Sequence, residues 1–599
     1  MYKNYNETIE TIQEKDQKQY GENGHMEYQW SNHIRENILQ FYFQLTRTSN
    51  EITLRKLENR LTQILTSLTE QSTSEKDVKK AYLSYLYCLI GQTRDIIEGK
   101  GEYTLTYMMI YVWYHYYQDL AFFALETLVQ NNENEHPYGS WKDMKYFYKY
   151  CRDKGCNDDH PLIQKIIEMT NQQLRQDQQT FTNPYSKNSN ISFVSKWIPR
   201  EKSKKWENLY TLLASDYFKE YIETGKKSSS EKAILKCKIE YRKMISTLNK
   251  YLDTSQVKQC DREWREIDFN KVTSITLSKN KKAFLNVKKN GDTRREEDDR
   301  IICASNFTNY IGESIKNNTE IKGKRIGMND FTKEAIQLIN ERNRANTITE
   351  SLQTQIDVLN MQWKNNSNQT ASLKKMIAMV DVSGSMEGEP LYAAIALGIR
   401  IAEKSMVGNR IMTFSANPTW VNLESSKTFL DKVETIKEAE WGMNTNFYKA
   451  LDKILDAIIE TRLSPEEVKD MTLVILSDMQ MDHADDSNMR TTNENQNWCL
   501  YNNIREKYEE TGIRLYGKPF QPPHILFWNL RSTDGFPNVS NEANTSMVSG
   551  FSPSLLNSFC ENGVSSLHSL TPWSLFIKTM DNERYRVLKT YLSNTLIHF

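Results

Sequence analysis

The sequence lacks the apolar segments that would place a chain in a membrane or direct it to secretion. Met1 to Glu7 contain none of the apolar stretch that a signal peptide requires. The longest apolar run, Tyr107 to Tyr117, covers only about half of the roughly 20 residues that cross a bilayer. We therefore expect no membrane partner and an intracellular, cytoplasmic location.

Cysteine is also sparse, and neither sign of charge is in excess. The 599 residues include 8 Cys, and the one close pair, Cys151 and Cys156, has no second pair to complete a zinc site. Lys and Arg total 77 and Asp and Glu total 77, so bulk charge does not predict a nucleic-acid partner. Locally, Ser186 to Arg300 contains 27 basic and 17 acidic residues, which can form a basic surface.

The length of the chain predicts several domains, at about 150 residues for each. Residues 1–28 are polar, and we expect a flexible tail there. Residues 29–365 carry apolar side chains at helical spacing with little strand alternation, which predicts an all-α domain. A helical-repeat, HEAT-like architecture is our expectation for it, although no repeat period is visible in the sequence. The polar stretch at 366–375 predicts a linker.

From residue 376 to residue 599, short apolar runs alternate with longer helical stretches. Strands that are buried on both faces and separated by helices are typical of a doubly wound, Rossmann-like α/β sheet. The predicted strands are Met376 to Val380, Ile411 to Phe414, Leu473 to Leu476 and Ile525 to Trp528.

Polar side chains follow the first predicted strand directly. Asp381, Ser383 and Ser385 come at its carboxyl end, where sheets of this kind place their ligands. A carboxylate with two hydroxyls suits Mg²⁺, which prefers oxygen ligands and keeps several of its waters. The sequence therefore predicts a site for Mg²⁺ or a similar divalent cation such as Mn²⁺.

This pattern resembles the metal-ion-dependent adhesion site (MIDAS) of von Willebrand factor A domains, in which DxSxS is followed by a distant Thr and a distant Asp. Thr445, before a predicted helix, and Asp478, after the third predicted strand, match those two positions. The resemblance implies that the serines bind the metal directly, the threonine directly or through water, and the aspartates largely through water. It also implies that a partner's carboxylate often completes the coordination.

Two other interpretations of this region stay open. The domain can have kept its loop and lost the ion. Four residues after Asp478 can form a second metal cluster, although we favour a solvated acidic loop; they are Asp482, His483, Asp485 and Asp486.

The helical half resembles an uncharacterised, domain-of-unknown-function family of plants, fungi and giant DNA viruses. Four runs carry the resemblance: Thr93 to Asp95 with Gly99 to Glu102, Tyr138 to Asp143, Lys196 to Ser203, and Tyr241 to Val272. That family is in turn similar in layout to Ro-type ribonucleoproteins, which join a TROVE-like ring of helical repeats to a von Willebrand A domain. The second resemblance implies binding of small noncoding RNA by the helical domain.

One basic segment also suggests RNA contact from its residues alone. Cations that neutralise phosphates stand beside aromatic faces that can stack on bases. The candidate residues are Lys196, Trp197, Arg200, Lys202, Lys204 and Lys205. The alternative is the start of a helix whose tryptophans are core anchors and whose lysines are solvated.

The chain contains no recognisable catalytic motif, and we predict a protein that is not an enzyme. No GxxxxGK[ST] loop occurs, and Gly99-Lys100-Gly101 is interpreted as an interhelical turn. Our first hypothesis is a Ro-like scaffold that binds a small structured RNA and docks a ligand through Mg²⁺. The alternative is a protein–protein interaction module that captures a carboxylate through its metal and binds no RNA. The abundant Asn, Lys and Ile fit an AT-rich genome, so a host cytoplasm or virion is expected if the source is viral.

Overall fold

The computed structural model describes residues 18–596, except 71–75, 131–135, 184–189, 224–229, 346, 415–416, 440–446, 482–499, 561–566 and 568. The chain divides into two compact units. The first, here called the sheet unit, comprises residues up to 89, 98–100 and 313–586. The second, the helical unit, comprises 90–97, 101–312 and the residues from 587 onward. These limits differ from the predicted domain boundaries because helices from both ends of the expected helical domain pack with the sheet.

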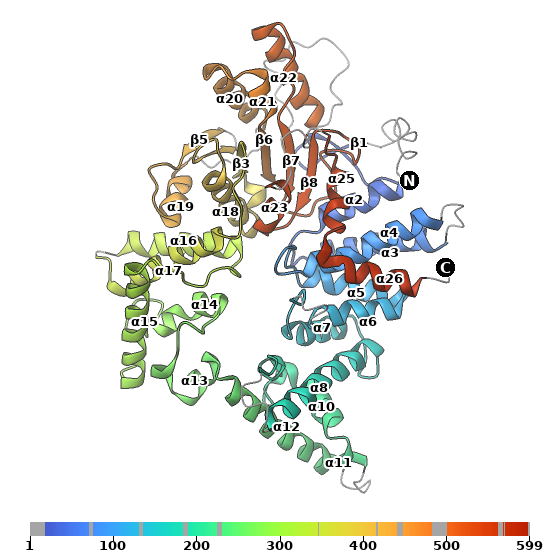
Figure 1. The fold of residues 1–599 in the computed structure, drawn as a ribbon, viewed down its shortest axis with the longest axis vertical. Helices are drawn as coiled ribbons and strands as arrows, with labels where there is room; N and C mark the ends of the chain where they lie inside the picture. The colour runs from blue at the N-terminus through green and yellow to red at the C-terminus, as the bar shows by residue number, and fades with distance from the viewer. Residues whose placement is uncertain are drawn as a thin grey trace. The chain divides into compact units, whose positions relative to one another are not determined.

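The sheet unit is built on six strands in the order β5-β4-β3-β6-β7-β8, and all neighbouring pairs are parallel except β4 with β5 (Figure 1). The strands are β3 (Met376–Asp381), β4 (Arg410–Phe414), β5 (Thr419–Asn422), β6 (Thr472–Ser477), β7 (His524–Asn529) and β8 (Thr545–Ser549). Four of them cover the four apolar runs predicted as strands, which confirms a C-terminal sheet of α/β type.

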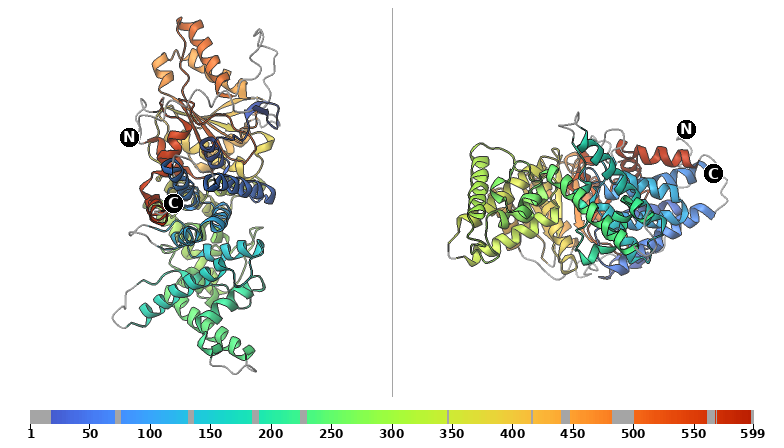
Figure 2. Two further views of the ribbon diagram at one scale, coloured as in Figure 1. Left: turned by 90° about the vertical axis from the view of Figure 1, so that its right-hand side faces the viewer. Right: turned by 90° about the horizontal axis from the view of Figure 1, so that it is seen from below.

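The connections reverse direction at the centre of the sheet. The chain leaves β3 through α18 (Glu389–Lys404) for β4, and later enters β6 on the opposite side of β3 after α19, α20 and α21. Right-handed crossovers that run in opposite directions place their helices on opposite faces of a sheet, and Figure 2 shows helices on both faces. The carboxyl ends of β3 and β6 therefore form a topological switch point, where open α/β sheets bind ligands. The helices in this region are α19 (Phe429–Glu438), α20 (Phe447–Glu460), α21 (Pro465–Lys469) and α22 (Leu500–Tyr516).

Helix α18 lies close against the central strand because of a glycine. A Cβ atom on Gly398 would come within 2.5 Å of Val380 on β3, a distance that side chains do not tolerate. At the start of the helix, Gly388 has φ of 93°, in the left-handed region that favours glycine. Gly388 lets the chain turn sharply before α18, and Gly398 lets α18 pack closely on β3. Together they hold the loop between β3 and α18 in place.

Helices from both ends of the predicted helical domain complete the sheet unit. Helix α2 packs on β8 and on α25, and α16 packs on α18 and α19. These helices bury apolar side chains against the sheet layer, as Phe331 and Trp363 do in the core. Their bounds are α2 (Ile34–Gln44), α3 (Glu51–Glu70), α4 (Lys76–Arg94), α16 (Met328–Arg344), α17 (Glu350–Ser367), α23 (Asn557–Cys560) and α25 (Pro572–Met580).

The polar stretch predicted as a linker begins inside a helix and is buried at its start. Helix α17 continues to Ser367, and Asn366 is only 1% exposed. The Asn366 amide donates to the carbonyls of Gly323 and Lys324, and its Oδ1 accepts from buried Arg400 at 2.9 Å. The prediction of a linker was wrong for residues 366–367, because polar side chains can be buried when they satisfy backbone groups and a buried cation.

The helical unit consists of helices that pack on their neighbours in sequence. Helix α5 packs on α6, α7 on α8, and α10 on both α8 and α12. A HEAT-like repeat remains a prediction. The elements are α5 (Thr104–Tyr116), α6 (Gln118–Thr127), α7 (Lys142–Asp153), α8 (Pro161–Thr182), α9 (Val194–Trp197), η2 (Lys204–Trp206), α10 (Glu207–Tyr217), α11 (Glu220–Glu223), α12 (Ser230–Leu252), α13 (Ser255–Asp261), η4 (Trp264–Glu266), α14 (Ser274–Phe284), α15 (Asp298–Lys316) and α26 (Arg586–Thr595).

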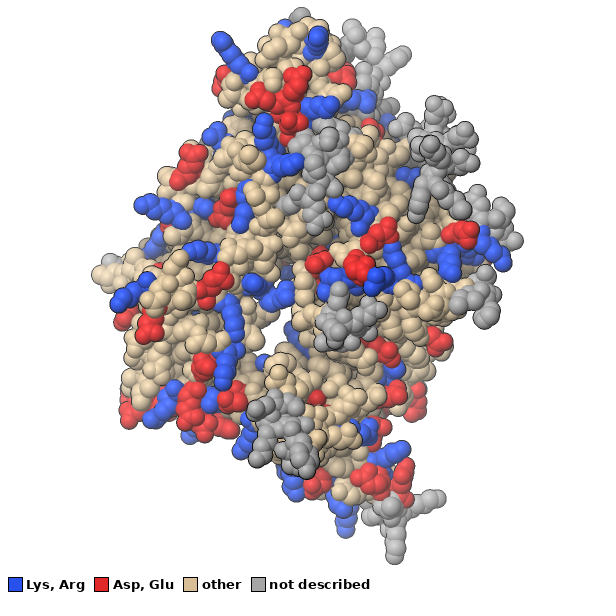
Figure 3. Space-filling view, viewed as in Figure 1, with Lys and Arg blue, Asp and Glu red and all other residues tan. Residues whose placement is uncertain are grey.

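The surface carries both signs of charge. On the face drawn in Figure 3, basic and acidic side chains are interspersed over the described residues, in keeping with a net charge of zero. Within the described part of the chain, none of the helices is both long and apolar enough to span a bilayer.

Candidate functional site

The predicted metal residues meet at the switch point between β3 and β6. Val380 pairs with Leu476 across the two strands, so Asp381 lies beside Ser477 at the carboxyl edge. The Ser477 hydroxyl donates a hydrogen bond of 2.5 Å to Asp381 Oδ2. Asp478 is the next residue, and the side chains of Asp381 and Asp478 are both fully buried.

The loop after β3 directs two hydroxyls to the same place. The Ser383 amide donates to Asp381 Oδ1 at 2.9 Å, which turns the chain back over the strand end. The hydroxyl oxygens of Ser383 and Ser385 are 3.2 Å apart. Asp381, Ser383 and Ser385 therefore converge as the sequence predicted. Thr445 lies outside the described residues, as does the acidic segment from Asp482 to Asp486.

The turn after β6 is held in an unusual backbone conformation. Met479 has φ of 65°, a left-handed value that is uncommon for a residue with a side chain. The Ser477 hydroxyl accepts from the Met479 amide at 3.0 Å, and Asp478 Oδ1 accepts from the Gln480 amide at 3.1 Å. Residues held in sparsely populated conformations concentrate at functional sites. Here the conformation keeps the Asp478 carboxylate at the edge of the sheet.

The two buried carboxylates repel each other. Burial and, after it, the charge of Asp478 raise the pKa of Asp381 to about 7. A cation already lies on the other side of this pair, because Arg531 Nε donates to Asp478 Oδ2 at 2.8 Å. The Arg531 guanidinium is shared with Glu22, to which it donates a second bond of 2.8 Å. Arg531 pairs with Asp478 and Glu22, and Asp381 adds a third carboxylate, so the acidic groups at this edge outnumber the guanidinium.

This donor set fits a hard divalent cation. Among the described residues, no group of three or more His, Cys, Asp and Glu side chains is suited to hold a metal, so a cation here depends on the serine hydroxyls. Ser383 and Ser385 would hold it together with Asp381 and Asp478. Hydroxyls with carboxylates are ligands that Mg²⁺ accepts, and excess negative charge in a buried place favours its binding.

An N-terminal hairpin lies beside this edge, within what was expected to be a flexible tail. Strands β1 (Lys18–Tyr20) and β2 (Met26–Tyr28) pair antiparallel, and Tyr28 bridges to Phe536. The Glu22 amide donates to the Gln480 side chain at 2.6 Å. The prediction of a flexible tail was wrong for residues 18–28, because these few polar groups pair with the loop that follows Asp478.

Sequence inspection missed Arg531, Ser477 and Glu22. A usable signal existed for Arg531, which stands two residues after the end of β7, at the same carboxyl edge as Asp381. Ser477 ends a strand and looks like an ordinary strand residue. Glu22 reaches the site through its contact with Arg531, which lies hundreds of residues later in the chain, and no local sequence pattern predicts that contact.

The predicted RNA-binding residues lie in the helical unit. Lys196 and Trp197 end the short helix α9 and are half-buried. The exposed side chains are Arg200, Lys202, Lys204 and Lys205. The Arg200 guanidinium lies 3.4 Å from Cys260 Sγ. The segment therefore combines an anchored aromatic residue with exposed cations. Both interpretations, RNA contact and the start of a helix with solvated lysines, require this arrangement.

Residues from the other sequence signatures of the predicted helical domain make contacts inside the protein. Arg94 and Asp143, from two separate runs, form a buried ion pair in which Arg94 Nε donates to Asp143 Oδ1 at 2.7 Å. Lys100, between its two glycines, belongs to the sheet unit, is buried and donates three hydrogen bonds within that unit. Lys100 is engaged within the protein, which agrees with an interhelical turn rather than a phosphate loop.

Two family models match parts of this chain. Residues 375–585 match the family model described as Domain of unknown function (DUF7788), and residues 147–372 match Domain of unknown function (DUF2828). An uncharacterized protein of Acanthamoeba polyphaga mimivirus is 27% identical over 576 residues, which cover 93% of this chain and 88% of that protein. The predicted similarity to an uncharacterised family with a giant-virus member is thereby supported.

A structural neighbour is also found. The crystal structure of the Deinococcus radiodurans Ro (RSR) protein is 11% identical, with a TM-score of 0.32, over 88% of this chain and 99% of that chain. A TM-score of this size does not establish a common fold. The von Willebrand A and Ro-like assignments stay predictions.

Proposed function

We propose that the sheet unit is a von Willebrand A-type docking module that holds Mg²⁺ or Mn²⁺ and binds a partner through a carboxylate. The observation that supports it is the burial of Asp381 and Asp478 together at the switch point, beside the hydroxyls of Ser383 and Ser385. When bound, the cation would neutralise the two carboxylates and present a coordination position to an acidic side chain of the partner.

A binding role suits these residues better than a catalytic one. Protein donors engage both carboxylates: Ser477 and the Ser383 amide bond Asp381, and Arg531 bonds Asp478. A general base needs a lone pair directed at the proton that it removes. Carboxylates held by several donors are positioned to balance charge, so we propose a protein that is not an enzyme.

The Asp381→Asn variant tests the metal site. The wild-type chain should bind Mn²⁺ in calorimetry, and saturating Mg²⁺ at about 100 times its Kd should stabilise the folded chain by about 2.7 kcal/mol. Asp381→Asn should abolish both effects, because an amide supplies no charge to the cation. The variant should still fold, since it removes the repulsion with Asp478.

The matched control is Asp470→Asn, which neutralises an exposed carboxylate in the turn just before β6, at the amino end of that strand. It should bind the metal like the wild type. Absence of Mn²⁺ binding by the wild-type chain, or equal binding by Asp381→Asn, would refute the metal site.

We also propose that the helical unit binds RNA, which would make the chain a ribonucleoprotein scaffold. The specific observation is that Lys202, Lys204 and Lys205 are exposed next to Trp206 and form no ion pair with any described residue. Unpaired cations beside an aromatic ring suit a phosphate backbone whose bases can stack. If the protein does not bind RNA, we propose the alternative function, a protein–protein interaction module that docks its partner at the metal site.

Changing Lys202, Lys204 and Lys205 together to Ala should weaken RNA binding roughly 10- to 100-fold at low salt. The slope of log K against log salt should fall by about 2, since each lost phosphate contact in single-stranded RNA removes about 0.7. The matched control replaces Lys149, Lys243 and Lys271, exposed lysines that already have ion pairs. Fluorescence anisotropy with labelled RNA measures both, and equal affinity of the two triple variants would contradict this surface.

A further inference from the structure

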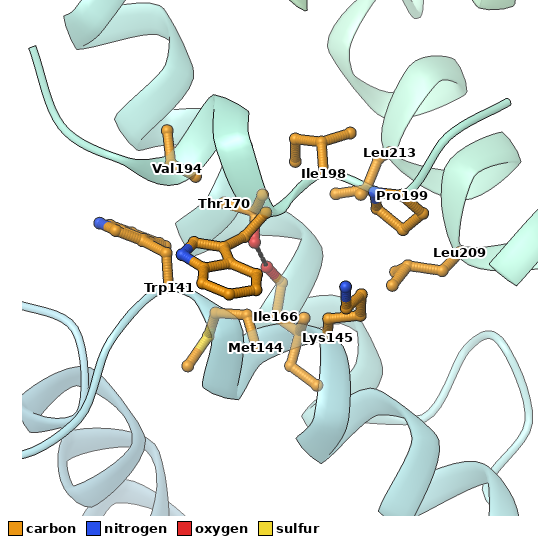
Figure 4. A pocket seen from close by; sticks show the side chains of 11 residues that line it. Trp141, Met144, Lys145, Ile166, Thr170, Val194, Ile198, Pro199, Leu209 and Leu213 are labelled. Atoms are coloured by element: carbon orange, nitrogen blue, oxygen red, sulfur yellow. Dashed lines mark hydrogen bonds between the residues drawn. The ribbon is translucent and has the colours of Figure 1, made fainter. Parts of the chain in front are cut away.

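A pocket in the helical unit combines apolar walls, aromatic rings and lysines. It is a narrow hollow among α7, α8, α9 and α10 (Figure 4), and the empty space of about 260 Å³ at this place includes the open solvent around it. Its apolar lining includes Met144, Ile166, Leu209 and Leu213, and Trp197 and Lys145 also line it. The ammonium group of Lys145 therefore lies beside an apolar surface.

Lys145 is the centre of this arrangement. Its Nζ lies 5.5 Å from the ring centroid of Trp197 and 5.4 Å from that of Trp206. The ring of Tyr146 is 5.5 Å away, and Tyr146 is itself an exposed aromatic side chain at 37%. Three rings from α7, α9 and η2 therefore surround one half-buried ammonium group.

Further lysines crowd the same place without carboxylates to neutralise them. Lys142 Nζ lies 5.9 Å from the Trp197 ring, Lys196 Nζ is also 5.9 Å from it, and Lys205 Nζ is 5.1 Å from the Trp206 ring. None of these lysines, nor Lys145, forms an ion pair with a residue that the structure describes. Burial and then the charges of Lys142 and Lys205 lower the pKa of Lys145.

The start of α7 places two cations where helices disfavour them. Its first and fourth residues are Lys142 and Lys145, at the positive end of the helix dipole, and the acidic residue of this turn, Asp143, is buried and paired with Arg94. Cation–π contacts alone can retain one lysine over a ring. They do not explain why four are gathered against each other, and residues that break local rules together often mark a binding site.

We propose that this pocket binds a nucleotide, with the base stacked on Trp197 and the phosphate held among Lys142, Lys145 and Lys205. The shared chemistry is a planar base joined to a phosphate, which single-stranded RNA or a free mononucleotide can supply. For the RNA source, the inference rests on the proposed RNA binding of the helical unit. It adds a site centred on Lys145 to that function, and this site shares Lys205 with the exposed run that includes Lys202 and Lys204.

The test compares Lys145→Met and Trp197→Leu in the full chain with Lys149→Met. Lys149 lies on the same helix, is exposed and is paired with Asp153, so its loss controls for the removal of one charge from α7. The probes are labelled oligoadenylate in anisotropy and AMP in calorimetry. Each pocket variant should weaken binding about tenfold, the effect of one stacked base or one buried contact, while Lys149→Met should leave it nearly unchanged.

Lys145→Arg keeps the charge and should retain most of the affinity, which separates loss of binding from loss of folding. If oligoadenylate binds the wild type and both pocket variants equally, the pocket is refuted and RNA binding elsewhere on the unit stands. If only AMP binds and the variants weaken it, the pocket is supported with a free nucleotide as its source, and the RNA proposal falls. Binding of neither probe by the wild type overturns the pocket.

Discussion

Replacing Asp143 by Ala should lower the free energy of unfolding of the helical unit by about 3–5 kcal/mol, the cost of removing one partner from a buried ion pair. Arg94 and Asp143 are 1% and 0% exposed. The guanidinium makes two parallel bonds, with Nε at 2.7 Å from Oδ1 and the terminal nitrogen at 2.9 Å from Oδ2. The Tyr107 hydroxyl and the Ser140 amide also donate to this carboxylate, each at 2.8 Å.

The electrostatics explain why the loss is large. Burial lowers the pKa of Arg94, and the charge of Asp143, its hydrogen bonds and the neighbouring tyrosines together offset that effect, so that the pKa is raised overall. Asp143→Ala would leave a buried guanidinium without its counter-charge and would also leave the donors of Tyr107 and Ser140 without an acceptor.

Two further variants show whether the loss of stability in Asp143→Ala comes from the buried ion pair. Asp153→Ala removes another ion-paired aspartate from α7, but its partner Lys149 is 41% exposed, so chemical denaturation should show a change of at most about 1 kcal/mol. The double variant Arg94→Met/Asp143→Leu should recover part of the stability, because no charge is then buried alone. A loss for Asp143→Ala no greater than for Asp153→Ala would show that the pair is not as buried as its contacts indicate.

The strands that could be predicted from the sequence are those with continuous apolar runs. β3, β4, β6 and β7 are of this kind, and each was predicted. β8, Thr-Ser-Met-Val-Ser, is also fully buried but has hydroxyls at three of its five positions. Those hydroxyls are satisfied by specific partners, as Ser546 is by His524 at 2.9 Å. Local hydrophobicity cannot reveal a strand whose burial depends on partners from other parts of the chain.

The placement of the candidate metal residues at one edge of the sheet could be predicted because Asp381, Ser383 and Ser385 stand in one short loop and Asp478 follows a recognisable strand. Their chemistry is local, so sequence spacing suffices. Arg531 and Lys145 were missed for the opposite reason: each is an ordinary basic residue until the fold places it beside Asp478 or between Trp197 and Trp206. The limits of the sheet unit were missed in the same way, since helical periodicity shows that a face is buried but not what covers it.

The second large effect is expected for Lys100→Met, which should destabilise the sheet unit by about 2–3 kcal/mol. The Lys100 ammonium donates to the carbonyls of Tyr42 and Leu45 at 3.0 and 3.1 Å and to the Ser549 hydroxyl at 2.6 Å. Tyr42 lies in the last turn of α2 and Leu45 caps it, so the lysine donates to two carbonyls at the end of the helix. The Tyr42 carbonyl also accepts from the Leu45 amide and from the Ser549 hydroxyl. Its charge also lies at the negative end of the helix dipole.

Methionine retains most of the length and apolar surface of the side chain, so a loss in Lys100→Met reports the three hydrogen bonds and the charge rather than a cavity. Lys56→Met is the control: Lys56 and its partner Asp534 are each 60% exposed, and the change should cost no more than about 1 kcal/mol. Chemical denaturation of both variants, followed by far-ultraviolet circular dichroism, gives the comparison. Equal stability of the two would mean that the end of α2 does not depend on Lys100. A phosphate loop would give a different result, because a lysine kept for a ligand can be removed with little loss of stability and with loss of phosphate binding.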